Sequence, residues 1–487
     1  MSALALGGAI RQRKISAPEA LNALFARLEQ TEGETHAYLT LDFEGAMRRA
    51  ERIQERIDRG DLSTPLAGVP IALKDNICVE DMKTTCASRM LADFVPPYSA
   101  TAAEKLLEQG MIIYGKLNMD EFAMGSTTET SYFGITLNPW GKDRVPGGSS
   151  GGAAAAVANG SAFCTLGSDT GGSIRQPASH CGVTGFKPTY GTVSRYGLIA
   201  YASSLEQIGP IGRDAADCAA LMDVIRGVDV RDSTTVSSVS KPYVDCLQSD
   251  ICGLRIGVPC ECLTGAISSD VAKCVERMAH ELEKLGAVVT KIKFPLMKYA
   301  VSAYYTIATA EAASNLSRYD GIKYGYRAAG DLPLSEVYTQ SRSEGFGSEV
   351  KRRIILGNFV LSAGYYDAYY RRALRAKAAI KAYFADVFQD CDLLLMPTAP
   401  TVAPRIGTCL NDVAGMYATD CYTVPANLAG LPALTLPCGF GTDGLSLPIG
   451  AQLIGPAHAD DLVLSVGYAY QQMTDYHTKR PREVSVP

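Results

Sequence analysis

Short apolar runs alternate with helical segments along this chain, and this alternation restricts its fold more than any other feature. The apolar run at residues 69–73 ends abruptly at Lys74, as expected for a buried strand with a charged residue at its carboxyl end. Thr101 and Glu104 form a capping box that predicts a helix, and a second apolar run follows at residues 111–114. A strand, a helix and a strand at this spacing predict a layered α/β fold.

The same alternation continues in the second half of the chain. A predicted strand at residues 253–258, a helix at 270–285 and a strand at 287–292 together make a βαβ unit. Further buried strands are predicted at residues 393–396, 433–436 and 450–454. These segments extend the predicted α/β fold to the end of the chain.

The N-terminal part is predicted to be helical, with one amphipathic helix starting near Ser16 and another over residues 43–59 that stops at Gly60. No tract of Pro, Ser or charge is long enough to separate domains. We therefore predict a single domain over residues 1–487. Its parts are a helical N-terminal portion at about 1–60, a core at about 65–215 and a C-terminal remainder that completes the sheet and the substrate site.

Composition excludes several classes of protein. The chain has 46 Lys and Arg against 51 Asp and Glu, a net charge of −5, and 47% hydrophobic residues, which excludes disordered, collagen-like and basic nucleic-acid-coating proteins. No apolar run approaches the ~20 residues of a membrane span, and residues 1–10 lack a signal-peptide pattern. We therefore expect a soluble cytoplasmic protein. The 14 Cys form no CxxC pair and the five His lie far apart, so no metal site is predicted.

Two blocks rich in Gly and Ser stand in the middle of the chain, at Pro146–Gly152 and Gly167–Arg175. The first could be a flexible linker or a phosphate-binding loop. An Ala-rich segment at residues 153–158 follows at once and Gly160 ends it, which favours a short helix over a linker. The Lys-Ser/Thr pair that a nucleotide loop needs is missing after the glycines, which disfavours the phosphate loop.

The segment between the blocks can bring two serines together. A helix over residues 151–158 advances roughly 12 Å at ~1.5 Å per residue. A strand over residues 162–166 returns roughly 16 Å at ~3.3 Å per residue. Ser149 and Ser173 can therefore meet at one end of the structure. The Gly-Gly pair before Ser173 leaves backbone N–H groups free of side chains, so this arrangement predicts a nucleophile with an oxyanion hole.

A serine nucleophile needs a base. His180 is the only His near the two blocks, but no neighbouring carboxylate orients it, which favours a structural role. Lys74 is the other candidate, although a lysine with a pKa near ~10.4 is almost wholly charged at pH 7 unless burial lowers that pKa. Asp75 would oppose the lowering if it lay close, and an ordinary surface charge is the alternative role for Lys74. The residues alone do not tell which serine is the nucleophile.

The three motifs resemble the amidase signature family. They are Lys74 in Leu-Lys-Asp-Asn, the Gly-Gly-Ser-Ser-Gly-Gly block and Gly-Ser-Asp-Thr-Gly-Gly-Ser-Ile-Arg-Gln-Pro, in that order. The resemblance implies an α/β fold with a large central mixed β-sheet covered by helices on both faces. It implies a Ser–Ser–Lys triad in which Ser173 is the nucleophile, Lys74 the base, and Ser149, after a cis peptide bond, the proton relay. The oxyanion would be held by the amides of Thr170, Gly171 and Gly172.

Four further stretches resemble the glutamine-hydrolysing subunits of tRNA-dependent amidotransferases within that family: residues 116–125, 190–210, 343–353 and 365–370. The resemblance implies that the chain hydrolyses glutamine and sends ammonia to a partner subunit, where ATP-activated Glu-tRNA(Gln) becomes Gln-tRNA(Gln). It also implies a heterotrimer with B-type and C-type subunits, in which ATP, Mg²⁺ and most tRNA contacts lie outside this chain, and no membrane association. The net charge of −5 agrees, because a main tRNA platform would carry a basic excess.

Glutamine as substrate requires a cation for its α-carboxylate and a carboxylate for its α-ammonium. By resemblance Arg353 should bind the carboxylate and Asp420 the ammonium, while Tyr304 and Ser126 line the site. Without the resemblance, residues 351–353 could be a solvated basic run and Asp420 a helix cap.

Two other functions are compatible with parts of the sequence. A stand-alone amidase for another small amide or carbamate is the alternative enzyme, and an enzyme for uncharged amides would not need both Arg353 and Asp420. A scaffold that kept the fold and lost the chemistry is disfavoured because Lys74, Ser149 and Ser173 are intact.

Overall fold

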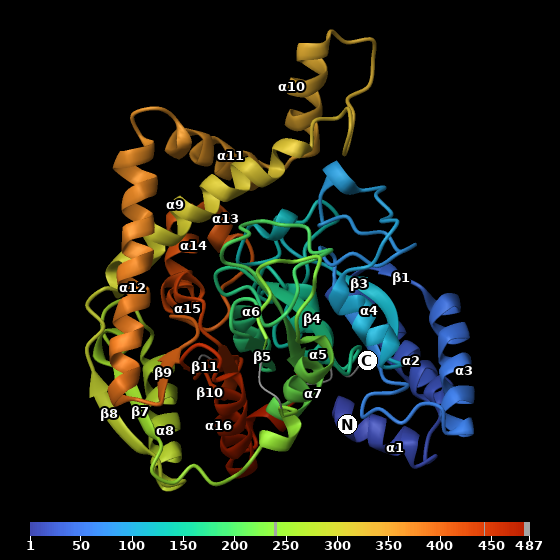
Figure 1. Cartoon of the computed structure of the whole chain (residues 1–487), viewed down its shortest axis with the longest axis vertical. Helices are drawn as coiled ribbons and strands as arrows, with labels where there is room; N and C mark the ends of the chain where they lie inside the picture. The colour runs from blue at the N-terminus through green and yellow to red at the C-terminus, as the bar shows by residue number, and fades with distance from the viewer. Residues whose placement is uncertain (238–240, 443, 482–487) are drawn as a thin grey trace.

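A mixed β-sheet of eleven strands, seen in a computed structural model that describes residues 1–237, 241–442 and 444–481, runs through the protein (Figure 1). Its strand order is β1-β3-β2-β4-β6-β5-β10-β11-β9-β7-β8. The strands are β1 (Tyr38–Leu41), β2 (Pro70–Lys74), β3 (Ile112–Leu117), β4 (Thr165–Asp169), β5 (Thr184–Lys187), β6 (Gln207–Gly212), β7 (Arg255–Pro259), β8 (Val288–Ile292), β9 (Leu393–Pro397), β10 (Ala433–Phe440) and β11 (Pro448–Ile454).

Parallel and antiparallel pairs occur in the same sheet. Strand β2 pairs in parallel with β3 and β4, and β7 pairs in parallel with β8 and β9. The strands between these groups pair antiparallel, as β4 does with β6 and β10 does with β11. The predicted α/β fold with a large mixed sheet is therefore confirmed.

Helices surround the sheet (Figure 1). They are α1 (Ala3–Arg11), α2 (Ala17–Thr35), α3 (Phe43–Arg59), α4 (Thr101–Glu108), α5 (Gly151–Asn159), α6 (Arg175–Cys181), α7 (Ala215–Ile225), α8 (Ser269–Lys284), α9 (Met297–Asn315), α10 (Leu334–Gly345), α11 (Ser348–Leu361), α12 (Arg371–Asp390), α13 (Thr408–Asn411), α14 (Val413–Ala418), α15 (Val424–Ala429) and α16 (Asp460–Met473).

Local sequence signals place several of these elements as predicted. Helix α3 spans Phe43–Arg59 and ends at Gly60, which adopts the left-handed conformation that favours glycine. The predicted βαβ unit is present as β7, α8 and β8, with β7 and β8 parallel. The predicted capping box at Thr101 is wrong, because Thr101 lies inside α4 and its hydroxyl donates to Asp229 instead.

The segment between β8 and β9 is mainly helical, and the sequence patterns predict no element within it. It contains α9 to α12, and Figure 1 shows α10 projecting away from the body of the molecule while α9 and α12 lie beside the sheet. Helix α9 packs against both α11 and α12. Within the part of the chain that the structure describes, no helix has the length and apolar character needed to cross a bilayer.

Candidate active site

Lys74 and Ser149 are in direct contact inside the protein. Lys74 is the last residue of β2, its side chain is fully buried, and its Nζ donates to Ser149 Oγ at 2.7 Å. Ser149 follows a cis peptide bond with Gly148 and comes just before α5. The amide of Ser150 donates to the backbone oxygen of Ser173 at 3.1 Å, so the loops that carry the two predicted serines lie side by side.

The environment of Lys74 favours its uncharged form. Burial lowers the pKa of Lys74 to about 7, although the carboxylates of Asp120 and Asp169 act in the opposite direction. Asp75, the next residue, instead forms an ion pair with buried Lys116 at 3.3 Å. A substantial fraction of Lys74 is therefore uncharged near neutral pH, as a base requires.

Asp169 shapes the turn before Ser173. Its Oδ1 accepts a hydrogen bond from the amide of Gly172 at 2.8 Å, and its Oδ2 accepts one from Arg175 Nε at 3.0 Å. Burial alone would raise the pKa of Asp169, but the Arg175 guanidinium holds it well below its usual range. This turn is therefore braced by a permanently charged pair within a few residues of Ser173.

The glycines of this turn have no room for side chains. A Cβ on Gly172, whose φ is +139°, would lie 2.4 Å from Thr423 Oγ1, and a Cβ on Gly171 would lie 2.4 Å from the ring of Tyr304. Thr170, Gly171 and Gly172 were predicted as oxyanion donors. The Gly172 amide donates to Asp169, which leaves Thr170 and Gly171 as the better placed donors of the three.

The residues predicted to bind substrate surround one small cavity beside Ser173. The cavity volume is about 10 Å³, room for about one water molecule, so binding of a larger ligand requires one wall to move. Its lining consists of Ala123, Gly125, Ser126, Gly148, Gly171, Gly172, Ser173, Tyr304, Tyr305, Arg353 and Asp420. Ser126, Tyr304, Arg353 and Asp420 therefore come together although they lie far apart in the sequence.

Arg353 reaches this cavity from α11. Its Nε donates to Glu349 Oε1 at 2.8 Å and its Nη1 donates to the Tyr201 hydroxyl at 2.8 Å. Its Nη2 is buried and has no hydrogen-bond partner among the described residues. The rings of Tyr201, Tyr305 and Tyr417 surround the guanidinium at 5.5, 5.2 and 5.3 Å. Arg353 is thus a rigidly held cation with one donor left for an anion.

Asp420 lies on another wall of the same cavity, in the 3₁₀ helix η7 (Thr419–Tyr422). Its Oδ2 accepts a hydrogen bond from the Tyr305 hydroxyl at 2.7 Å, and its Oδ1 accepts one from Ser126 Oγ at 3.2 Å. Burial raises the pKa of Asp420 to about 6, because these donors compensate only in part for the lost hydration. A ligand ammonium would compensate for the rest.

Sequence reasoning missed several residues that hold this site. Glu349 binds both Arg353 and the Tyr417 hydroxyl, the latter at 2.6 Å. Tyr417 stacks on Tyr305 with ring centroids 3.9 Å apart. Glu349 could have been found, because it lies four residues before Arg353 on one helix. Tyr417 could not, because it meets the others only through tertiary packing.

The surroundings of His180 favour a structural role over that of a catalytic base. His180 lies at the end of α6, and burial lowers its pKa to about 4, so it is neutral at pH 7. Its Nδ1 has no hydrogen-bond partner among the described residues. No group of three or more His, Cys, Asp or Glu residues is placed to hold a metal ion in the described part of the chain.

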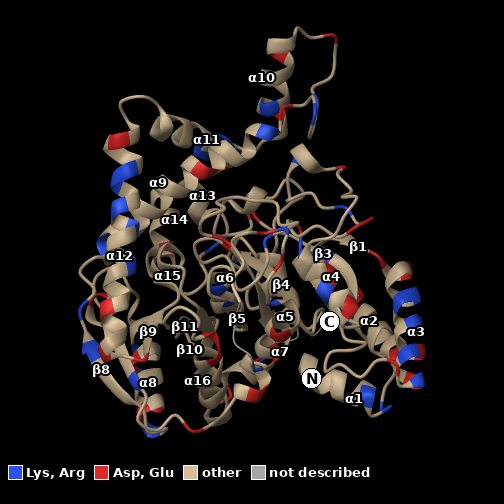
Figure 2. Ribbon diagram, in the orientation of Figure 1, with Lys and Arg blue, Asp and Glu red and all other residues tan. Residues whose placement is uncertain are grey.

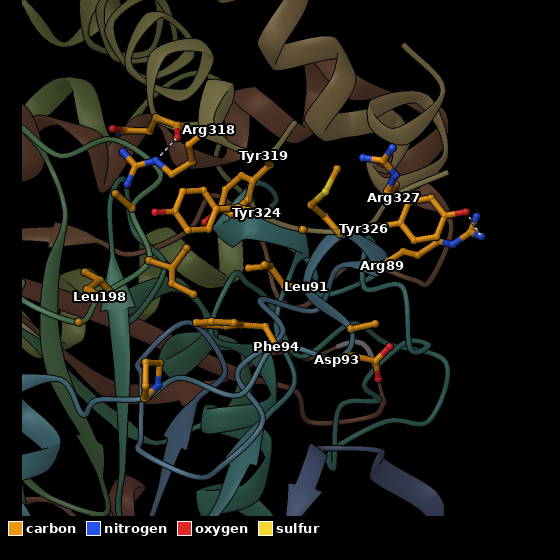
Figure 3. A pocket seen from close by; sticks show the side chains of 18 of the residues that line it. Arg89, Leu91, Asp93, Phe94, Leu198, Arg318, Tyr319, Tyr324, Tyr326 and Arg327 are labelled. Carbon is orange, nitrogen blue, oxygen red and sulfur yellow. Dashed lines mark hydrogen bonds between the residues drawn. The ribbon is translucent and has the colours of Figure 1, made fainter. Parts of the chain in front are cut away.

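A larger cavity of about 840 Å³ lies elsewhere, between the segments at residues 89–98, 197–200 and 315–327. Figure 3 shows Tyr319, Tyr324 and Phe94 around it, with Arg318 and Arg327 at its upper side. None of the predicted site residues lines it. Ser173 and the four residues predicted to bind substrate line the small cavity instead.

Comparisons with known proteins identify the family of the chain. A family model described as Amidase matches residues 19–464. The A subunit of glutamyl-tRNA(Gln) amidotransferase from Lachnoclostridium phytofermentans is 52% identical, with 99% of this chain and 98% of the relative covered. The crystal structure of the protein of that name from Thermotoga maritima is 40% identical, with a TM-score of 0.77 over 94% of this chain and 95% of that chain. The structure of 6-aminohexanoate cyclic dimer hydrolase is 26% identical, with a TM-score of 0.85 over 99% of this chain and 98% of that one.

The matched residues include the whole sheet from β1 to β11 and both blocks rich in Gly and Ser. The family that the motifs resemble is thereby confirmed. The chain belongs to the amidase family.

Proposed function

We propose that this chain is the glutamine-hydrolysing subunit of a tRNA-dependent amidotransferase that converts Glu-tRNA(Gln) to Gln-tRNA(Gln). One observation carries the proposal: a buried arginine with an unpartnered Nη2 and a buried carboxylate line the same cavity as a serine. Arg353 fits the α-carboxylate of glutamine and Asp420 fits its α-ammonium. An uncharged small amide would leave the buried Nη2 of Arg353 without an acceptor and the carboxylate of Asp420 without a cation, which is costly.

The catalytic roles in this proposal follow from the contacts of Lys74. The uncharged Lys74 amine accepts the proton of Ser149 Oγ, which lies 2.7 Å away, while Ser149 accepts the proton of Ser173. Ser173 Oγ then attacks the side-chain amide carbon of glutamine. The oxyanion lies against backbone amides of the turn at Thr170 and Gly171.

The remaining steps return the protons. The C–N bond breaks as the proton held on Lys74 passes back through Ser149 to the leaving nitrogen, which departs as ammonia. Water attacks the resulting γ-glutamyl ester, gives its proton to the same chain of groups and releases glutamate. The net reaction converts glutamine and water to glutamate and ammonia, and the three side chains end in their starting states.

The partners in the proposal come from the relatives. The relatives at 52% and 40% identity are each named as the A subunit of an amidotransferase, which supports a complex with B-type and C-type subunits. In that complex ATP, Mg²⁺ and most of the tRNA contact the partner, in keeping with the net charge of −5 on this chain. The proposal places the complex in the cytoplasm.

Glutamine hydrolysis by the chain co-purified with its partner subunits tests the proposal. We expect glutamate release that increases when ATP and Glu-tRNA(Gln) are added. A fluorophosphonate probe should label the parent chain and the exposed-serine variant Ser317→Ala, but not Ser173→Ala. Labelling without any hydrolysis of glutamine, together with turnover of an uncharged amide, would instead indicate a stand-alone amidase.

A further inference from the structure

Exposed apolar side chains gather on the connection between α11 and α12. Of the 26 large apolar side chains that the described residues leave exposed, eight lie between residues 355 and 374. We call them the hairpin patch: Ile355, Leu356, Phe359, Leu361, Tyr365, Tyr366, Tyr369 and Leu374. Figure 1 shows this connection at the upper edge of the molecule, away from the sheet. Apolar groups concentrated in this way mark an interaction surface.

The centre of the hairpin patch is a preformed aromatic cluster. The ring of Phe359 lies 4.3 Å from that of Tyr365 and 5.9 Å from that of Tyr369, measured between centroids. Tyr365 and Tyr369 are themselves 5.9 Å apart. Rings that hold one another in place lose little conformational freedom when a partner covers them, which is the property of an anchor in an interface.

The hairpin patch lies on the back of the substrate site. Arg353 and Phe359 point in different directions from α11: Arg353 is 2% exposed and Phe359 is 43% exposed. Ile355, also on the outer face, is 68% exposed. A molecule bound to the patch is therefore one helix away from the cation proposed to bind glutamine.

The patch is flanked by positive charge. The first fifteen residues of α12, at 371–385, contain no Asp or Glu and five basic residues: Arg371, Arg372, Arg375, Lys377 and Lys381. Arg372 and Arg375 are exposed, and no carboxylate in the described part of the chain lies within ion-pair distance of either. Figure 2 shows this basic run along α12.

We propose that the hairpin patch is the docking surface for the partner subunit, and that the partner offers an apolar area bordered by acidic side chains. This inference rests on the proposed function, which requires a partner close enough to receive ammonia. The apolar centre excludes water, and the basic flank selects a partner of opposite charge.

Two other occupants fit the patch less well. A tRNA would use the basic flank, but Ile355, Leu356 and Leu374 neither stack on bases nor pair with phosphates. A second copy of this chain would bring the patch against itself across a two-fold axis, and the eight apolar side chains of the patch offer no acidic group to the basic flank. A protein partner with an apolar area and acidic side chains around it can contact both the hairpin patch and the basic flank.

Paired variants test the inference through co-purification with tagged B-type and C-type subunits. The first variant, Phe359→Asp with Tyr369→Asp, puts charge into the apolar centre. The second, Arg372→Glu with Arg375→Glu, reverses the flank and leaves the centre intact. The matched control is Val230→Asp, because Val230 is 99% exposed at a distant site. Each double variant should weaken assembly by roughly tenfold or more, whereas the control should assemble like the parent.

Folding and activity are measured on the same variants. Glutamine hydrolysis by each chain without partners should stay within about twofold of the parent, because the patch lies outside the catalytic machinery. The stimulation by ATP and Glu-tRNA(Gln) should be lost together with assembly. A chain that assembles poorly but hydrolyses glutamine normally is a folded chain with a damaged docking surface.

Three results would overturn the inference. The first is that both double variants assemble as well as Val230→Asp. The second is that the parent chain dimerises alone through the patch, and the third is that Arg372→Glu with Arg375→Glu binds tRNA more weakly while its assembly is intact. Assembly is also measured in a Ser173→Ala background. Failure of the proposed function, seen as a parent chain that does not hydrolyse glutamine, is thereby separated from failure of the docking surface.

Discussion

The loops around Lys74, Ser149 and Ser173 and the helical segment from α9 to η7 meet at one cavity but are built by different means. The loops are short, fully buried, and fixed by hydrogen bonds to backbone groups, as when Lys74 Nζ donates to Ser168 O at 3.2 Å. In the helical segment, Arg353 and Asp420 are separated in the sequence by α12, β9, α13 and α14, and they meet through a set of stacked tyrosines. The proposed function thus places the reaction chemistry in the loops and the selection of substrate in the helices.

If this division holds, changes in the loops should stop the reaction with every amide, and changes in the helical segment should act mainly on glutamine. The largest effect is expected for Ser173→Ala. We expect hydrolysis of glutamine and of simple amides to fall by roughly 10⁴-fold or more, because no other hydroxyl can replace the nucleophile. Steady-state kinetics with both substrates, with Ser317→Ala as the control, measures this. Residual turnover near the parent level would assign the attack to another group.

The second effect is expected for Lys74→Met, at roughly 10³-fold on both kinds of substrate. Lys187→Met is the matched control, because burial also lowers the pKa of Lys187 to about 7, and this variant should keep most of the activity. In the parent, kcat/KM should rise with pH through about 7, where Lys74 loses its proton. A rate that is flat from pH 6 to 8.5 would contradict a lysine base.

The lowered pKa of Lys74 also predicts how the free energy of unfolding changes with pH. Its pKa is about 7 in the folded protein and near ~10.4 in the unfolded chain, so the unfolded chain binds more protons between these values. The contribution of Lys74 to the free energy of unfolding should therefore become more favourable to the folded state as pH rises from 7 toward 10. Urea unfolding of the parent and Lys74→Met across this range should show a smaller pH slope in the variant.

The third effect separates the two regions. Arg353→Met should lower kcat/KM for glutamine by roughly 100-fold, because a charge-assisted hydrogen bond and an ion pair are lost. Reaction with a simple amide such as propionamide should change by less than about threefold. Lys351→Met, on the same helix, should behave like the parent. Equal losses on both substrates would place Arg353 in the chemistry rather than in selection.

A smaller effect is expected for Asp420→Asn, at roughly 10- to 30-fold on glutamine. The parent should also lose activity toward glutamine as pH falls below about 6, because a protonated Asp420 cannot pair with the substrate ammonium. In Asp420→Asn this acid limb should disappear, whereas the limb near pH 7 from Lys74 should stay. An acid limb unchanged in the variant would show that another group controls it.

The smallest effect is expected for Glu349→Gln. Glu349 contacts Arg353 and Tyr417 but does not line the cavity, so it positions Arg353 without touching substrate. We expect the KM for glutamine to rise by roughly three- to tenfold with little change in kcat, and Glu349→Asp to recover part of the loss. A drop in kcat with an unchanged KM would contradict a positioning role.

The sequence predicted the loop region well because its signals are local. The short helix after Ser149 was predicted over residues 151–158 and spans Gly151–Asn159, and the strand before Ser173 was predicted over 162–166 and lies at Thr165–Asp169. Glycines, prolines and the run of alanines restrict the backbone within a few residues, so their effects can be read in order along the chain. The roles proposed for Lys74, Ser149 and Ser173 come from the family resemblance.

The helical segment was far less predictable. Arg353 and Asp420 were named only through the resemblance, and neither Tyr305 nor Tyr417 was named at all. Nothing near Tyr417 in the sequence indicates that its ring stacks on Tyr305 or lies beside the guanidinium of Arg353. Such contacts join residues far apart in the sequence, and only the packing of α9, α11 and α14 decides them.

The sequence by itself determined the alternation of strands and helices, the buried strand that ends at Lys74, and the glycine turn that leaves backbone amides beside Ser173 without side chains over them. These follow from steric and hydrogen-bonding preferences that act between near neighbours. Tertiary structure alone decided that the amine of Lys74 loses its water, that Asp75 pairs with Lys116 instead, and that Arg353 faces Asp420 across one cavity. Burial and charge pairing depend on which distant segments pack against a group, and a short stretch of sequence does not show which segments these are.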